Sequence, residues 1–83
     1  MNLQAHTSEV LMLLAENARN NTSPAVVGSE VIADRLAMTL PETKQLLKVL
    51  DGFGFITNDI DGQYSLITHK GLQWLGQTYI EQQ

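Results

Sequence analysis

Residues 32–56 read IADRLAMTLPETKQLLKVLDGFGFI, and this stretch decides the fold. Residues 32–37 and 41–53 both place apolar side chains at helical spacing, and a three-residue turn separates the two patterns. Gly54 interrupts the second pattern, and Phe55-Ile56 begins a β-forming run. The stretch therefore predicts two helices joined by a tight turn, with the second helix followed by a strand.

The second of these helices carries a clear start signal. Thr39 followed by Glu42 is the pattern of a capping box, in which each side chain bonds the backbone N–H of the other residue. Pro41 fits the first helical turn because its missing N–H would have no partner inside the helix. The stripe predicted to face the core consists of Thr43, Leu47 and Leu50.

The rest of the chain supplies a helix before this stretch, then a hairpin and a helix after it. Asp61-Gly62 is a hairpin turn signal because both residues tolerate positive φ, and Thr68 can cap the last helix. The expected elements are helices over residues 4–19, 28–37, 41–53 and 69–81 and strands over 25–27, 55–60 and 63–67. The inward residues of the other three helices are predicted as Val10, Leu11, Leu14, Ala18, Val31, Ile32, Leu36, Leu72, Leu75 and Tyr79. The predicted class is α+β and mostly helical, with the order α-β-α-α-β-β-α in a single domain over residues 1–83.

Composition bounds the function. The chain has 83 residues, a net charge of −4 and no cysteine, so disulfides and thiolate metal sites are excluded. We expect no membrane span and no signal peptide, and a cytoplasmic, prokaryotic protein. No nucleophile with a base, no phosphate-binding glycine loop and no metal-ligand spacing occurs, which predicts a protein that is not an enzyme and has no cofactor and no metal.

Three segments carry a family resemblance. They are Ile32-Ala33-Asp34-Arg35-Leu36, then Leu47-Lys48-Val49-Leu50-Asp51 followed by Gly54-Phe55-Ile56, and finally YSLITHKGLQWL over residues 64–75. In this order and spacing, the chain resembles the winged helix-turn-helix transcriptional regulators, which include the multiple-antibiotic-resistance and arsenical-resistance repressors. The resemblance covers residues 9–75. It implies a winged helix-turn-helix fold and a small DNA-binding regulator that acts as a dimer on double-stranded DNA.

The resemblance also implies which residues contact DNA. It places the helix over residues 41–53 in the major groove, with Pro41, Lys44, Gln45 and Lys48 on the contacting face. The spacing agrees, because these residues form one stripe opposite the predicted core stripe. Arg35 and Lys70 are further candidates for phosphate contacts. Four cations in contact with phosphates would give a salt slope of about −3.6 for log K.

Three features argue against DNA binding. Many relatives have an Arg at the position of Gln45 or of Val49, and the family's wing often carries Arg or Lys where this chain has Asp59 and Asp61. Glu42 also brings a carboxylate to the entrance of the contacting helix. The alternative for Lys44 and Lys48 is a solvated helix face, with Lys48 paired to Asp51. The alternative function is therefore a winged-helix protein–protein interaction module that does not bind DNA.

Two apolar groups are candidate interfaces. Leu46, Val49 and Phe53 form a second stripe on the helix over residues 41–53, which either packs in the core or meets a partner. Trp74, Tyr79 and Ile80 lie on the last helix and cannot all face the core. We expect a homodimer through the last helix, with the first helix as the second candidate element, and ordinary packing as the alternative.

Overall fold

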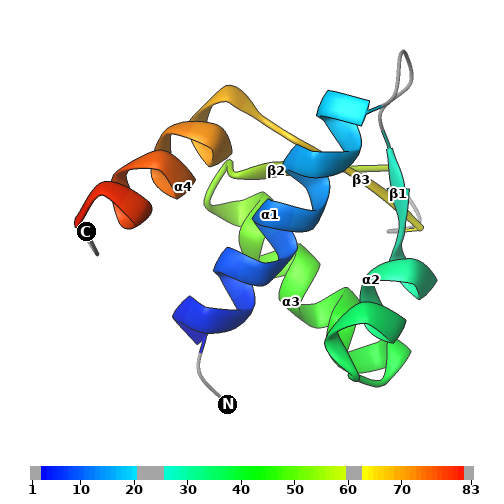
Figure 1. Cartoon of the computed structure of the whole chain (residues 1–83). Coiled ribbons are helices and arrows are strands. Elements are labelled where there is room, and N and C mark those ends of the chain that lie inside the picture. The colour runs from blue at the N-terminus through cyan, green and yellow to red at the C-terminus, as the bar shows by residue number, and fades with distance from the viewer. Residues whose placement is uncertain (1–2, 21–25, 60–62, 82–83) are drawn as a thin grey trace.

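The structure of the protein is a computed structural model. It describes residues 3–20, 26–59 and 63–81, and all their side chains except those of residue 20 and residues 77–81. Within these residues, four helices and three strands follow the predicted order α-β-α-α-β-β-α. They are α1 (Leu3–Asn20), β1 (Val27–Gly28), α2 (Ser29–Leu36), α3 (Leu40–Gly52), β2 (Ile56–Asn58), β3 (Tyr64–Ile67) and α4 (His69–Glu81), as Figure 1 shows.

The three strands form one antiparallel sheet with the order β1-β3-β2. The central strand, β3, pairs Ser65 with Val27 of β1 on one side and with Asn58 of β2 on the other. All three strands are shorter than or shifted from the predicted ones, and the predicted Asp61-Gly62 turn lies outside the described residues. The mostly helical α+β class is confirmed, and the arrangement is compatible with a winged-helix-like class.

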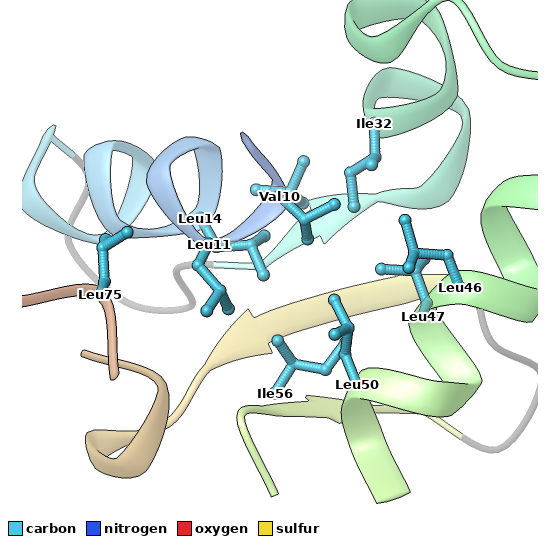
Figure 2. Close-up of a cluster of buried hydrophobic side chains, with 10 residues drawn as sticks. Val10, Leu11, Leu14, Ile32, Leu46, Leu47, Leu50, Ile56 and Leu75 are labelled. Atoms are coloured by element: carbon cyan, nitrogen blue, oxygen red, sulfur yellow. The ribbon is translucent and has the colours of Figure 1, made fainter. Parts of the chain in front are cut away.

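The core lies between α1, α3 and the sheet. α1 crosses the middle of the molecule, with α4 on one side and α2 on the other (Figure 1). The labelled core side chains point toward one another from every helix and from β2 (Figure 2). The buried apolar side chains of this cluster are Val10, Leu11, Leu14, Val27, Ile32, Leu46, Leu47, Leu50, Ile56 and Leu75.

Three residues predicted to face the core are exposed instead. Ala18 lies on the surface of α1, and Val31 is 49% exposed on α2. The buried stripe of α2 consists of Ser29, Ile32 and Ala33 at helical spacing, and Val31 lies outside it. Leu72 of α4 is also exposed, because the stripe that faces the protein contains Gly71 and Leu75. The side chain of Tyr79 lies outside the described residues.

The start of α3 is capped as predicted. The Glu42 backbone N–H donates to Thr39 Oγ1 at 3.3 Å, and the Thr39 N–H donates to Glu42 Oε1 at 3.4 Å, which completes the capping box. Pro41 occupies the first turn, and Thr43, Leu47 and Leu50 are all buried. The Glu42 carboxylate is therefore engaged by Thr39 on the surface, at the end of the helix where a negative charge is favourable.

The turn between α2 and α3 contains a strained alanine. Ala37 has a φ of 54° and a ψ of 42°, the left-handed conformation. The Met38 N–H donates to the Ala33 carbonyl and the Ala37 N–H to the Asp34 carbonyl, which is the hydrogen-bond pattern of a Schellman motif. This position normally holds glycine, because a Cβ is unfavourable in the left-handed region.

We expect Ala37→Gly to raise the free energy of unfolding by about 1 kcal/mol, because it removes the Cβ clash of the left-handed backbone. For a domain of this size the midpoint of thermal unfolding should rise by roughly 4–8 °C. Thermal unfolding followed by circular dichroism measures the change. The matched control is Ala18→Gly on the exposed side of α1, which should lower stability because glycine is unfavourable inside a helix. A lower midpoint for Ala37→Gly would contradict the expectation.

Thr68 connects the start of α4 to the loop after α3. Its Oγ1 donates to the Gly54 carbonyl at 2.6 Å and accepts from the Gly71 N–H at 3.1 Å. Its backbone N–H donates to the Phe55 carbonyl at 3.0 Å. The predicted cap of α4 is confirmed, and the same residue also bonds the segment in which Gly54 has a φ of 82°.

Candidate nucleic-acid interface

The outer face of α3 carries the predicted contact residues. Pro41, Lys44, Gln45 and Lys48 are all exposed, opposite the buried stripe of the same helix. Among the residues that the structure describes, neither Lys44 nor Lys48 has an acidic partner within 4.0 Å. The predicted alternative of a Lys48–Asp51 ion pair is therefore not formed. Both ammonium groups are available to an anionic ligand.

Lys44 lines a groove between α3, the start of α2 and the start of β3. The groove has a volume of about 420 Å³ and is lined by Gly28, Ser29, Glu30, Val31, Leu40, Lys44, Gln63 and Tyr64. Two links bring these distant segments together: Gly28 pairs with Tyr64 in the sheet, and the Ser29 N–H donates to the Gln63 carbonyl at 2.8 Å. The groove lies between the basic side of α3 and the hairpin, which consists of β2 and β3.

Tyr64 and Gln63 are groove residues that the sequence reasoning missed. Tyr64 is 51% exposed and points away from the core, because its neighbour Ser65 is fully buried and side chains alternate along a strand. That alternation was readable from the sequence. The position of β3 next to Lys44 was not, because it depends on the pairing of β1 with β3.

Gln45 faces a different groove. This second groove has a volume of about 290 Å³ and lies between the start of α1 and α3, with Leu3, Glu42, Gln45, Leu46 and Val49 as its lining. Pro41 and Lys48 thus lie on a ridge between two grooves. Lys44 lines the groove on one side of this ridge, and Gln45 lines the groove on the other side. Lys44 and Gln45 are neighbours in sequence but line separate depressions.

Arg35 and Lys70 are not part of this face. Arg35 lines a third groove between α1 and α2, together with the acidic side chains of Glu9 and Glu16. Lys70 places its Nζ 5.6 Å from the centre of the Phe55 ring, a cation–π contact. The structure brings Lys44 and Lys48 to one helix face and leaves the other two cations on other surfaces.

Asp59 has a structural role in the hairpin. Its Oδ1 accepts from the Gln63 N–H at 2.7 Å and from the Tyr64 N–H at 3.2 Å, so the carboxylate caps the start of β3. Bonds of this kind to a charged group are stronger than neutral ones. The negative charge that the sequence placed on the hairpin thus holds the two groove residues in position. Asp61 lies outside the described residues.

The second stripe of α3 is only partly available to a partner. Leu46 is 4% exposed and belongs to the core, which agrees with the alternative that it packs in the core and contradicts the alternative that it is an exposed partner contact. It packs in the core cluster with Val10, Ile32 and Leu47, and it also lines part of the second groove. Val49 and Phe53 are 40% and 50% exposed, one helical turn apart.

An aromatic row continues from this stripe. The rings of Phe53 and Phe55 are 5.6 Å apart, and those of Phe55 and Trp74 are also 5.6 Å apart. Phe55 and Trp74 are half-buried against the core. Sequence reasoning named Phe53 and Trp74 separately and missed Phe55, which joins them. We call Val49, Phe53, Phe55 and Trp74 the apolar strip. The side chains of Tyr79 and Ile80 lie outside the described residues.

No group of three or more His, Cys, Asp or Glu side chains in the described ranges is arranged to hold a metal ion. Among the helices that the structure describes, none has the length and apolar character needed to cross a membrane. The chain matches no protein-family model, and no curated protein or solved structure is significantly similar to it.

Proposed function

We propose that the protein is a winged helix-turn-helix DNA-binding domain that acts as a transcriptional regulator or accessory factor. The single observation that carries this proposal is the exposed basic side of α3, where Lys44 and Lys48 have no acidic partner in the described residues and Lys44 lines a groove together with Gln63 and Tyr64. In this proposal α3 enters the major groove of double-stranded DNA, and Tyr64 and Gln63 approach the adjacent backbone.

The chemistry of the α3 face suits a duplex. Lys44 and Lys48 can contact phosphates or the O6 and N7 acceptors of guanine, and Gln45 can pair with the N6 and N7 of adenine. Pro41 lies in the capped first turn, where the helix end would be closest to the bases. With Arg35 and Lys70 on other surfaces, the α3 face supplies two phosphate contacts per protomer instead of the four first expected.

The proposal includes a homodimer. Two copies that read successive turns of DNA must hold their α3 helices about 34–36 Å apart. Packing the two copies through the apolar strip would bring α3 against α3 at roughly 8–10 Å, which is too close. Leu72, which is exposed on α4, therefore suits the dimer contact better than the apolar strip.

We expect weak, strongly salt-dependent affinity for random duplex DNA. Two contacts predict a slope of about −1.8 for log K against log[salt], and a dimer with two copies of the face predicts about −3.6. Fluorescence anisotropy of a labelled duplex over a range of salt concentrations gives the slope, and analytical ultracentrifugation of the same samples gives the number of copies. Absence of affinity at low salt from a folded, dimeric sample would refute DNA binding.

The second candidate function is a protein–protein interaction module without DNA binding. It is favoured by the apolar strip, whose members Val49 and Phe53 are exposed, and by the acidic pI of about 4.8. Contiguous exposed apolar surface is typical of partner sites. In this case the partner would contact the apolar strip, and charge reversal at Lys44 and Lys48 would leave partner binding unchanged.

A further inference from the structure

Asn58 makes hydrogen bonds to two elements. It is the last residue of β2, and its side chain is half-buried. Its Nδ2 donates to the Leu47 carbonyl of α3 at 3.1 Å, and its Oδ1 accepts from the Ser65 hydroxyl of β3 at 2.6 Å. Ser65 is fully buried at the centre of the sheet, between β1 and β2. One amide therefore links the middle of α3 to both strands of the hairpin.

This link differs from the packing around it. Apolar contacts between α3 and the sheet are non-directional and tolerate small sliding movements. A hydrogen bond weakens steeply when its angle departs from linearity, so the Asn58 bonds select one position of β2 along α3. Breaking these bonds would also cost free energy, because a buried polar group would be left without a partner.

The position of Asn58 also affects the groove that contains Lys44. The next residue, Asp59, bonds the backbone N–H groups of Gln63 and Tyr64, and these two residues line the groove that contains Lys44. The Leu47 carbonyl of α3 is thus connected to the hairpin side of the groove by the hydrogen bond of Asn58, the peptide bond to Asp59 and the hydrogen bonds of Asp59.

We propose that Asn58 is a positioning residue that fixes the hairpin relative to α3 and thereby sets the geometry of the Lys44 groove. The proposal rests on the proposed function, because the groove is part of the DNA-binding face. Asn58 contacts no DNA in this proposal and acts through Gln63 and Tyr64.

The test compares Asn58→Asp with Thr57→Asp. Each variant adds one negative charge to β2, but Thr57 is exposed and lies on the other side of the strand. In Asn58→Asp an acceptor oxygen replaces the donor to the Leu47 carbonyl, while Ser65 can still donate to the carboxylate. We expect Asn58→Asp to bind random duplex DNA about tenfold more weakly than Thr57→Asp at 50 mM salt, roughly the loss of one phosphate contact.

Two further measurements separate positioning from stability. Affinities are measured at a temperature at which circular dichroism shows both variants fully folded, where a purely structural role would leave affinity unchanged. Amide hydrogen exchange at Gln63 and Tyr64 should become faster in Asn58→Asp, whereas exchange in α3 should keep its wild-type rate. Should Asn58→Asp fail to fold, Asn58→Thr adds no charge, favours a strand and has too short a side chain for both bonds. It should show the same loss relative to wild type.

Equal affinities and equal exchange rates in the Asn58 and Thr57 variants would overturn the positioning role. If wild-type protein binds no DNA at any salt concentration, the proposed function fails by itself. The exchange rates at Gln63 and Tyr64 then still decide whether Asn58 fixes the hairpin.

Discussion

Gly71→Ala is expected to lower the free energy of unfolding by about 3 kcal/mol, at the upper end of the usual cost of overpacking. A Cβ at this position would lie 2.2 Å from the Phe55 carbonyl oxygen and 3.0 Å from Cγ1 of Ile67. The carbonyl cannot move away easily, because it accepts the Thr68 N–H at 3.0 Å in the same turn. The midpoint of thermal unfolding should fall by roughly 12–24 °C, measured by circular dichroism or calorimetry.

Gly76→Ala is the matched control for this prediction. It makes the same chemical change five residues later in α4, where a Cβ would meet nothing within 4 Å. There the substitution should be neutral or should stabilise the protein by up to about 1 kcal/mol, because alanine favours a helix more than glycine does. Similar effects of the two substitutions would show that α4 does not approach Phe55 as closely as the structure indicates.

Lys44→Glu combined with Lys48→Glu is expected to abolish salt-dependent DNA affinity. Two phosphate contacts at roughly 0.9 each contribute about 200-fold to the binding constant between 1 M and 50 mM salt, and reversal adds repulsion. Both side chains are exposed and have no acidic partner in the described residues, so stability should change little. Anisotropy titrations with random duplex DNA at 50 mM salt measure the loss.

The control for this variant carries the same total charge. Arg19→Glu, Ala18→Glu and Gln73→Glu together change the charge by four, as the double lysine reversal does, and take the net charge from −4 to −8. All three side chains are exposed and lie on α1 or α4, away from the α3 face. If this variant loses as much affinity as the lysine variant, binding depends on overall charge and the α3 face has no special role.

The sequence predicted α3 and its surroundings well because the signals there are local. The capping box needs only Thr39 and Glu42, and the buried stripe follows from the helical spacing of Thr43, Leu47 and Leu50. The cap of α4 was found for the same reason. The exposure of Lys44 and Lys48 follows from the position of the stripe, since residues opposite a buried stripe face solvent.

Features that depend on contacts between distant segments were not predictable. Nothing near Arg35 in sequence indicates that α1 brings Glu9 and Glu16 beside it. The requirement for glycine at position 71 arises from the approach of α4 to Phe55, which only the folded chain creates. The sequence shows Asp59 only as a negative charge on the hairpin, and its capping role is not readable there because its hydrogen bonds depend on the geometry of the hairpin.

The hydrogen bonds from Thr68 to the Gly54 and Phe55 carbonyls have a consequence for regulation. They join the loop that ends α3 to the first turn of α4, so a tilt of α3 must either break them or carry the start of α4 with it. α3 holds the lysines, and α4 holds Leu72 of the suggested dimer contact. If DNA tilts α3 on binding, nucleic-acid binding and the pairing of two copies become thermodynamically linked, and each must change the affinity of the other by the same factor.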